Sequence, residues 1–376
     1  MAISAAGIVF SNLNNNTLSR LTRGRTVAAI PFACRYRLID FCLSNLVNAN
    51  ISNIHVVANY NYRSLLEHIG SGKDWDLARR KDNINIISPY QTATSASAKV
   101  FATHMEALIN MQQYIDEFKE EHVVLMDSDT VLNIDIADVI EYHEKTKSDI
   151  TIVTKLPDSG YTAKHPRMFV SSVAGKITDA VMTNEATSKN PELVLNIYVM
   201  KTTYLRSLID EAVAYGYNSF TGMLLAKYKH MNYRTYCYDG YAASVSSFLD
   251  YYKYSIELAT NKASRDSLLN VRSRPIFTRV HNSSPVVYSK IANVKNSLIA
   301  DDCVIEGTVE NSIISRGVHI EKGATVKNSI IFQGTVIGKN AQLNCIVTDK
   351  NVTVSEGIVL SGNSNMPFFV QKGRKV

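Results

Sequence analysis

The sequence predicts an α/β protein in which a Rossmann-like domain with a mostly parallel sheet precedes a parallel β-helix. Two observations support this prediction. Up to about residue 245, short apolar runs typical of strands alternate with amphipathic segments typical of helices, as they do when helices cover both faces of a parallel sheet. After Pro285, the pattern changes to short apolar pairs separated by single glycine and asparagine residues, and this pattern repeats.

The first domain, residues 1–245, is expected to contain strands joined by helices. The strand-like runs are residues 5–10, 54–58, 84–88, 123–126, 150–155, 193–200 and 233–238. The helix-like segments between them include residues 36–46, 62–69, 100–118 and 203–215. In an open sheet of this kind, ligands bind at the carboxyl ends of the strands. We therefore expect functional side chains at the strand ends.

Residues 246–285 are expected to form a helical linker. The stretch SSFLDYYKYSIELAT, at residues 246–260, begins with a serine that can cap a helix and continues with apolar residues at helical spacing. We expect this helix to bridge the two domains. Its tyrosines, Tyr251, Tyr252 and Tyr254, are expected to pack against a core rather than to stack on a ligand.

Residues 286–376 contain an internal repeat. Asn-Ser-Leu-Ile at Asn296 recurs as Asn-Ser-Ile-Ile at Asn311 and Asn328. This spacing is close to one three-sided coil of a parallel β-helix, in which each coil is stable only when stacked on its neighbours. Many such β-helices are acyltransferases with a catalytic histidine. His319 is the one histidine in these coils, and no constellation of cysteine or carboxylate accompanies it, which disfavours that activity.

The composition is that of an ordinary globular protein. Of the 376 residues, 45% are hydrophobic and 20% are charged, and the formal net charge is +6. No nucleic-acid-binding module accompanies the basic residues, so we expect no nucleic-acid partner. Five scattered cysteines without paired spacing fit a reducing compartment. The chain shows no signal-peptide pattern and no run long enough to cross a bilayer, so we expect a cytoplasmic protein that spans no membrane.

The loop after the first strand has the position of a phosphate-binding loop but not its composition. The apolar residues 5–10 end abruptly at Ser11, and the sequence continues Asn-Leu-Asn-Asn-Asn-Thr. A loop that wraps a phosphate needs glycines, because its backbone must approach the anion and adopt positive φ. Asn12, Leu13 and Asn15 carry side chains that would fill this space. The sequence therefore predicts a loop of the nucleotide-binding type that has lost its ligand.

Several longer stretches resemble one enzyme family. They are PFACRYRLIDFCLSNLVNANI (31–51), HIGSGKDWDL (68–77), MDSDTVLNID (126–135) and the NSII coils, and they are similar to ADP-glucose pyrophosphorylase, also called glucose-1-phosphate adenylyltransferase. The resemblance covers nearly the whole chain. It implies a nucleotidyltransferase domain of the GT-A type, which transfers AMP from ATP to glucose 1-phosphate, and a left-handed β-helix that assembles and regulates a tetramer. In that family, ADP-glucose feeds glycogen synthesis.

Measured against the motifs of that family, the catalytic positions of this chain are altered. The affected motifs are, in chain order, the glycine-rich phosphate loop, the Arg-x-Lys-Pro segment, the sugar-phosphate lysine, the Asp-Phe-Gly segment and the second metal-binding aspartate. The substituted positions are Asn12, Leu13, Asn15, Thr17, Val27, Thr183, Ser219 and Ser244. The resemblance therefore implies that this chain has no complete catalytic site.

Two positions keep the residues of the family. Asp129 matches the first metal-binding aspartate, and Arg25 matches the arginine of the Arg-x-Lys-Pro segment. The resemblance implies that they belong to a residual substrate or nucleotide pocket, with weak metal binding at Asp129 if there is any. The alternative is that Asp127 and Asp129 cap the turn after a strand. Because Ser244 replaces a carboxylate, we expect no cofactor for this chain and assign Mg²⁺ to a catalytic partner.

Arg20, Arg23 and Arg25 form a basic cluster beside the altered loop. This cluster can be interpreted either as a solvated face or as a site for an anionic effector such as a sugar phosphate. Runs of like charge usually form solvated faces, which favours the first interpretation.

The substitutions affect several separate catalytic functions, while the scaffold motifs remain. Losing a single charge-stabilising donor costs on the order of a hundredfold in rate, so we expect little or no activity from this chain alone. The pattern resembles the D-type, non-catalytic subunit of the bacterial family. That resemblance implies pairing with a catalytic subunit, in a heterotetramer, and self-association when the partner is missing. The alternatives are an active nucleotidyltransferase with a remodelled site and a stand-alone sugar-phosphate sensor.

Overall fold

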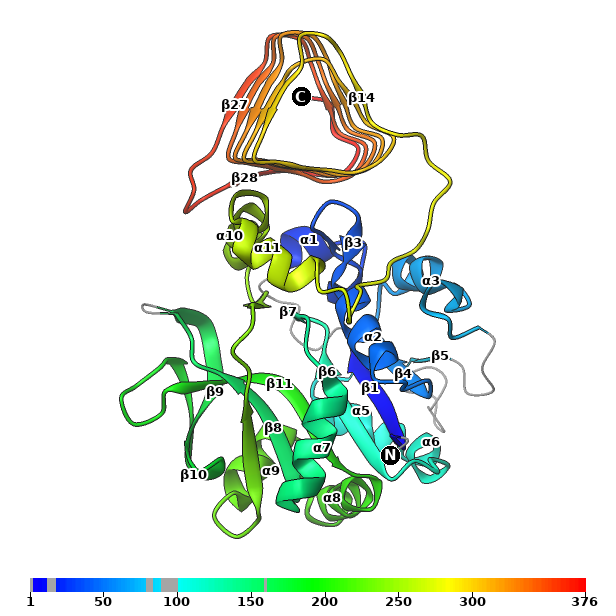
Figure 1. Ribbon diagram of the computed structural model, residues 1–376, viewed down its shortest axis with the longest axis vertical. Helices are drawn as coiled ribbons and strands as arrows, with labels where there is room; N and C mark the ends of the chain where they lie inside the picture. The colour runs from blue at the N-terminus through cyan, green and yellow to red at the C-terminus, as the bar shows by residue number, and fades with distance from the viewer. Residues whose placement is uncertain (1–2, 12–17, 79–83, 89–100, 159–160) are drawn as a thin grey trace.

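The computed structural model describes residues 3–11, 18–78, 84–88, 101–158 and 161–376. It contains an α/β domain followed by a triangular left-handed parallel β-helix, with helices packed between them (Figure 1). The predicted fold class is therefore confirmed. Four of the altered positions, Asn12, Leu13, Asn15 and Thr17, lie outside the described residues, so their roles stay predictions.

A nine-stranded mixed sheet forms the centre of the α/β domain, in the order β5-β4-β1-β6-β11-β8-β12-β10-β9. Its strands are β1 (Ala5–Phe10), β4 (Ile54–Val57), β5 (Ile84–Ile87), β6 (His122–Asp127), β8 (Ile150–Lys155), β9 (Thr162–Val173), β10 (Lys176–Glu185), β11 (Glu192–Lys201) and β12 (Tyr233–Cys237). Strands β10 and β11 run opposite to the others, so the sheet is mostly parallel in direction.

Every strand predicted in this domain is present, but the hairpin of β9 and β10 is an addition. The outer parts of these two strands are exposed and carry polar and charged residues. Such strands give no continuous apolar run, and for that reason the sequence did not reveal them. Two smaller antiparallel pairs complete the domain, β2 (Pro31–Phe32) with β3 (Tyr36–Arg37) and β7 (Thr130–Leu132) with β13 (Ala242–Ser244).

Helices cover both faces of the sheet. They and the short helical turns are α1 (Ser19–Thr22), η1 (Val27–Ala29), α2 (Leu38–Asn48), α3 (Arg63–Ile69), η2 (Lys73–Trp75), α5 (His104–Asn110), α6 (Gln112–Asp116), α7 (Ile136–Thr146), α8 (Thr202–Tyr215) and α9 (Phe220–Lys227). Side chains of α2, α3 and α7 pack on one face and those of α5, α6, α8 and α9 on the other. The contact with α2 is close, because a Cβ added at Gly7 of β1 would lie 2.7 Å from Cδ1 of Leu46.

The β-helix consists of three parallel five-stranded sheets, visible end-on in Figure 1. Its strands are β14 (Val287–Tyr288), β15 (Asn293–Lys295), β16 (Leu298–Ile299), β17 (Val304–Ile305), β18 (Thr308–Glu310), β19 (Ile313–Ile314), β20 (His319–Ile320), β21 (Thr325–Lys327), β22 (Ile330–Ile331), β23 (Val336–Ile337), β24 (Gln342–Asn344), β25 (Ile346–Thr348), β26 (Thr353–Val354), β27 (Val359–Ser361) and β28 (Phe368–Val370). In the Asn-Ser-Ile-Ile coils, the second isoleucine (Ile314, Ile331) lies in the core of the β-helix, and the first (Ile313, Ile330) lies in the cluster shared with α10.

The repeated Asn-Ser pair builds one corner of the β-helix. Asn296, Asn311 and Asn328 adopt left-handed φ values of 44°, 48° and 47°, which asparagine tolerates better than most residues. Their amides form a ladder, in which Nδ2 of Asn296 donates to Asn311 at 3.3 Å and Nδ2 of Asn311 donates to Asn328 at 3.3 Å. The hydroxyl of Ser312 accepts the backbone N–H of Ser329, one coil further on, at 3.0 Å. The repeat is therefore a structural device.

Two helices, α10 (Phe248–Thr260) and α11 (Lys262–Leu269), lie between the α/β domain and the β-helix (Figure 1). The hydroxyl of Ser247 caps α10 by accepting the N–H of Asp250 at 3.1 Å. Tyr251 and Tyr252 are buried in a core that both domains share, and Tyr252 donates its hydroxyl to the carbonyl of Asn328. The expected helix is present and its tyrosines pack in a core, whereas residues 270–285 of the expected helical linker contain no helix.

Two further observations concern function classes. Among the described residues, no helix combines the length and the hydropathy that a bilayer span requires. His319 does have a carboxylate neighbour, Glu306 on the adjacent coil, at 3.4 Å. Both side chains are about 40% exposed, which is typical of a surface pair rather than of an enclosed catalytic base.

Candidate functional site

The carboxyl end of β6 carries acidic residues at the ligand edge of the sheet. Asp127 is the last residue of β6, Asp129 follows after Ser128, and all three are buried. Strand β1 lies beside β6, with Phe10 in register with Asp127. The loop that begins at Ser11 therefore starts next to the two aspartates, where an open α/β sheet binds its ligands.

Both carboxylate oxygens of Asp127 have partners within the protein. Asn196 donates from Nδ2 to Oδ2 at 2.8 Å, and Nε2 of His104 lies 2.7 Å from Oδ1. Burial disfavours the charged form of His104, but the attraction and the hydrogen bond of Asp127 outweigh this effect, and the pKa of His104 is raised. The carboxylate of Asp127 therefore favours the protonated form of His104.

Asn196 has an unusual backbone conformation for a strand residue. Its φ is +54°, and it lies in β11 where the pairing with β8 shifts register between Val194 and Tyr198. A left-handed residue other than glycine inside a strand costs on the order of 1 kcal/mol and persists only where its surroundings hold it. Its hydrogen bond to Asp127 is one such restraint. The strained conformation thus accompanies the placement of the Asn196 amide at the ligand edge of the sheet.

Asp129 faces a buried arginine. Arg167, from β9, places Nη1 3.7 Å from Oδ2 of Asp129, and the two side chains are 9% and 5% exposed. Thr130 donates its hydroxyl to the other carboxylate oxygen at 3.1 Å. Burial raises the pKa of Asp129, and the positive charge of Arg167 offsets part of that rise. The guanidinium thus provides the positive charge that a buried carboxylate requires.

The structure brings Ser244 next to Asp129, as expected for the two positions that match metal ligands. Ser244 is the last residue of β13 and pairs with Thr130 of β7. The backbone N–H of Val245 donates to the carbonyl of Asp129 at 2.7 Å. The Ser244 hydroxyl is buried and has no hydrogen-bond partner among the described residues. The geometry of a two-carboxylate site therefore remains, but one carboxylate is missing.

Magnesium does not fit this set of residues. Mg²⁺ requires near-octahedral oxygen ligands, usually including carboxylates. One oxygen of Asp129 faces Arg167, the other accepts a hydrogen bond from the hydroxyl of Thr130, and Ser244 offers a neutral hydroxyl. Among the described residues, no group of three or more His, Cys, Asp and Glu side chains is placed to hold a metal ion. We therefore assign no metal-dependent step to this site.

The alternative role of Asp127 and Asp129 as caps of the next turn is wrong. A capping carboxylate accepts backbone N–H groups. In the described structure, Asp127 contacts His104 and Asn196, and Asp129 contacts Arg167 and Thr130, all through their side chains.

The other altered positions lie in different surroundings. Thr183, on β10, is in register with Arg167, so a cation lies directly across the hairpin from the position of the missing lysine. Ser219 is exposed and caps α9 by accepting the N–H of Gly222 at 3.0 Å. Val27 is buried in the core shared by the two domains. Of these three positions, Thr183 is the one that a contact in the structure links to Asp129, through Arg167.

The basic cluster belongs to the junction between the domains. Arg25 is 6% exposed and donates from Nη2 to Oδ1 of Asp349, in the β-helix, at 2.6 Å. The guanidinium of Arg20 lies 5.2 Å from the ring centroid of Phe248 in α10. Arg23 donates to Gln371 at 3.4 Å. Each of the three arginines therefore contacts either α10 or the β-helix.

This placement corrects two predictions about Arg25. The solvated-face interpretation fails for Arg25 because its guanidinium is buried, although Arg20 and Arg23 remain exposed. The grouping of Arg25 with Asp129 in one pocket also fails, because Arg25 pairs with Asp349 and Asp129 pairs with Arg167. The sequence could not show this exchange of partners, since each pair joins residues that lie far apart in the chain.

Three residues of the site were not identified from the sequence: Arg167, His104 and Asn196. A signal existed for Asn196, which interrupts the apolar run of β11 with an amide. Arg167 lies in the hairpin that the sequence did not reveal, and His104 begins a helix that was recognised only by its apolar spacing.

Comparisons with known proteins agree with this architecture. Residues 15–163 match the nucleotidyl transferase family, and residues 285–366 match the GlmU-like C-terminal hexapeptide family. The chain is 34% identical to the glycogen biosynthesis protein GlgD of Bacillus subtilis, over 98% of this chain and 95% of that protein. It is also 34% identical to GlgD of Geobacillus stearothermophilus, over 98% and 96%.

Catalytic relatives match over much of the same length. The glucose-1-phosphate adenylyltransferase of Fervidobacterium nodosum is 28% identical, over 93% of this chain and 84% of that protein. The family match over nearly the full length, together with the α/β domain and the β-helix, confirms the resemblance on which the motif comparison rested. This chain therefore belongs to the ADP-glucose pyrophosphorylase (glucose-1-phosphate adenylyltransferase) family and is GlgD-like.

Proposed function

We propose that this chain acts in glycogen biosynthesis as a regulatory subunit with little or no activity of its own. It would pair with a catalytic glucose-1-phosphate adenylyltransferase subunit, in a heterotetramer, and raise that subunit's rate of ADP-glucose formation. Two relatives that match nearly the whole chain carry the name glycogen biosynthesis protein, and others are adenylyltransferases, which supports the choice of pathway.

The observation that carries the proposal is the pairing of Arg167 with Asp129. A nucleotidyltransferase of this family needs a divalent cation between its carboxylates to neutralise the phosphates of both substrates. Here a guanidinium faces the one remaining carboxylate, and Ser244 stands where the second would be. A guanidinium can neutralise Asp129, but unlike a metal ion it has no coordination sites for substrate oxygens. The residues of this site therefore support the stability of the fold rather than catalysis of phosphoryl transfer.

A regulatory role requires the chain to interact differently with two states of its partner. The retained scaffold supports such contacts, because residues after the altered loop pack into one core with α10 and the β-helix. A displacement of the segment after the altered loop would therefore change its contacts with the β-helix. Self-association without the partner is part of the same proposal, and light scattering of the isolated chain would measure it.

The first experiment assays the purified chain alone with ATP, Mg²⁺, glucose 1-phosphate and pyrophosphatase. We expect a rate of ADP-glucose formation at least a thousandfold below that of a catalytic subunit, since several charge-stabilising groups are absent. Turnover at an ordinary enzyme rate would establish the alternative of an active enzyme with a remodelled site.

The second experiment co-expresses the chain with a catalytic subunit and purifies through a tag on one of them. We expect co-purification and a rate per catalytic subunit at least severalfold above that of the catalytic subunit alone. Failure to co-purify would leave the stand-alone sensor as the better hypothesis. Co-purification without any change in rate would reject the regulatory role but would still support assembly with the catalytic subunit.

An anionic effector, if the complex responds to one, is proposed to bind at the basic junction. Lys350 lies there, and its pKa is lowered to about 8 by burial and by the positive charges of Arg37 and Arg25. A sugar phosphate would relieve this repulsion. Charge reversal at Arg23 should abolish the response of the complex to a sugar phosphate, whereas an unchanged response would remove the effector from this junction.

A further inference from the structure

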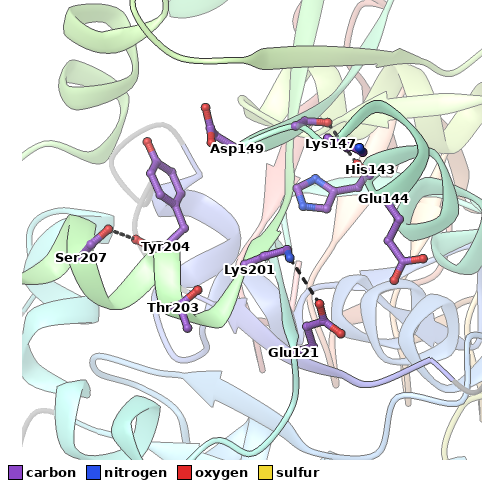
Figure 2. Close-up of a pocket in the computed structure, with 10 residues that line it drawn as sticks. Glu121, His143, Glu144, Lys147, Asp149, Lys201, Thr203, Tyr204 and Ser207 are labelled. Atoms are coloured by element: carbon purple, nitrogen blue, oxygen red, sulfur yellow. Dashed lines mark hydrogen bonds and ion pairs between the residues drawn. The ribbon is translucent and has the colours of Figure 1, made fainter.

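A cavity of about 690 Å³ lies at the edge of the sheet opposite to Asp127 and Asp129 (Figure 2). It is formed by the end of α7, the start of β8, the end of β11 and the start of α8. Lys201, which lines the cavity, is in register with His122, the first residue of β6, whereas Asp127 is the last residue of that strand. Its volume is in the range of small-molecule sites, and neither the family motifs nor the proposed function uses it.

A buried histidine lines this cavity. His143, in the last turn of α7, is 1% exposed, and its imidazole projects towards the space between Tyr204 and Lys201 (Figure 2). Nδ1 lies 3.0 Å from the hydroxyl of Thr151, but Nε2 has no hydrogen-bond partner among the described residues. The ring of His122 packs edge-on against it, with 5.5 Å between centroids, and fixes its orientation. A buried polar atom without a partner is costly, and a ligand can supply one.

The hydrogen bonds behind His143 favour the tautomer that carries the proton on Nδ1. Thr146 donates its hydroxyl to the carbonyl of Tyr142 at 2.8 Å, and Ser148 lies 2.6 Å from the Thr146 hydroxyl. The orientation that satisfies the whole chain has Ser148 donating to Thr146, Thr151 donating to Ser148 and Nδ1–H of His143 donating to Thr151. Burial lowers the pKa of His143 to about 4, so the ring is neutral at pH 7. Nε2 is therefore an acceptor that needs a donor.

The lining of the cavity contains both hydrogen-bond donors and acceptors. Glu121, Glu144 and Asp149 contribute carboxylates, and Lys147 and Lys201 contribute ammonium groups. Lys201 and Glu121 already pair at 3.4 Å. Helix α8 begins here without a side-chain cap; its first N–H, that of Thr202, donates to the carbonyl of Glu121 at 2.8 Å, and the N–H groups that follow can serve as further donors. The half-buried ring of Tyr204 supplies an apolar face.

This mixture favours a neutral ligand with many hydroxyl groups. An anion would meet the three carboxylates, and a cation would meet both ammonium groups. A hydroxyl both donates and accepts, so a sugar can satisfy Nε2 of His143, the carboxylates and the N–H groups at the same time. The C–H face of a sugar ring can pack on the aromatic ring of Tyr204.

We propose that this cavity binds a neutral sugar, with a glucosyl unit as the specific ligand. A sugar hydroxyl would donate to Nε2 of His143, and others would engage Glu144, Asp149 and Lys147. The class of neutral polyol rests on the cavity, and the choice of glucose within that class rests on the proposed function. The glucosyl unit can come from a free sugar or from the end of an α-glucan, and the two sources are separated by experiment.

The test measures binding to the isolated full-length chain by isothermal titration calorimetry. The probes are glucose, maltoheptaose, inorganic phosphate and spermidine. The variants are His143→Gln and Ser207→Trp, the latter filling the cavity from its exposed rim, with Val213→Trp as the matched control on the same helix outside the cavity. Circular dichroism verifies that each variant folds. If His143→Gln does not fold, Ser207→Trp still tests the proposal.

We expect saturable binding of at least one of the two sugars with a dissociation constant in the millimolar range or below. Both cavity variants should weaken it at least tenfold, and Val213→Trp should leave it within twofold. Maltoheptaose binding at least tenfold tighter than glucose identifies a glucan, and equal binding identifies a free sugar. No saturable sugar binding up to 50 mM, unchanged binding by Ser207→Trp, or tighter binding of phosphate or spermidine would overturn the proposal. Because no catalytic partner is present, this outcome is independent of the test of the proposed function.

Discussion

Arg167 and Asp129 give the altered site its character at the scale of single residues. Their oppositely charged side chains are each less than 10% exposed. They lie beside Ser244, at the position that matches a carboxylate in the family motif. Removing one member of a buried pair leaves an uncompensated charge, which costs far more than the pair itself contributes. The pair therefore keeps the buried carboxylate of Asp129 next to a compensating positive charge.

Substitution of either partner tests this pairing. We expect Arg167→Gln and Asp129→Asn each to lower the free energy of unfolding by about 2–4 kcal/mol, and the double variant to lose about 1–3 kcal/mol less than the sum. Urea unfolding followed by circular dichroism measures all four proteins. The exposed pair of Arg63 and Glu67 is the control, and its removal should cost less than about 1 kcal/mol. Strict additivity at Arg167 and Asp129 would show that the two do not act as a pair.

His55 makes stability depend on pH. It is 4% exposed on β4, and burial lowers its pKa from 6.5 to about 4, with Glu120 opposing part of the shift. Between these two values the unfolded chain binds the proton and the folded chain does not, so stability rises with pH across that window and is lost as the pH falls through it. This residue should contribute a loss of about 2 kcal/mol between pH 7.5 and pH 5.

The measurement compares urea unfolding at the two pH values for the wild type and for His55→Gln. The variant should be less stable at pH 7.5 but should lose about 2 kcal/mol less on acidification. Substitution of the exposed His230 by glutamine is the control. A pH dependence that is the same in wild type and His55→Gln would mean that His55 is already accommodated in its charged form.

The asparagine corner shows how an element is specified by its repeat. Asn311 meets two requirements at once, a left-handed backbone and a rung of the amide ladder. Asn311→Gly keeps the backbone conformation and loses the rung, whereas Asn311→Ala loses both. We expect the alanine variant to be about 1 kcal/mol less stable than the glycine variant in urea unfolding. Equal stabilities would indicate that the backbone conformation relaxes without cost.

Elements with a strong periodic signal could be predicted, and those whose position depends on distant partners could not. The strands of the sheet and the coils of the β-helix follow from apolar runs and from the Asn-Ser repeat, because each is a local pattern. The β9–β10 hairpin gave no such signal, and it carries Arg167. The altered positions of the site were recognisable by resemblance, but the cation facing Asp129 was not. Pairs such as Arg167 with Asp129, 38 positions apart, are determined by tertiary packing.

At the scale of the whole molecule, one core joins the two domains. Leu21 and Val27 from the segment after the altered loop, Tyr251 of α10 and Phe332 of the β-helix belong to the same cluster of buried side chains. The pair of Arg25 and Asp349 lies beside it, with the guanidinium 5.8 Å from the ring centroid of Phe332. The segment that contains Leu21, Arg25 and Val27 is thus part of the contact between the two domains.

Asp349→Ala is expected to uncouple the domains. It leaves the buried guanidinium of Arg25 unpaired, at a cost of about 3–5 kcal/mol to the junction. Trp75 is the single tryptophan of the chain, so its fluorescence reports on the α/β domain, while far-ultraviolet circular dichroism reports on both domains. In urea, the two probes should give coincident transitions for the wild type and separate ones for Asp349→Ala.

The double variant Arg25→Met, Asp349→Leu replaces the buried pair by apolar side chains and should restore coincidence, because no charge is then left unpaired. Coincident transitions in all three proteins would show that the shared apolar core alone couples the domains.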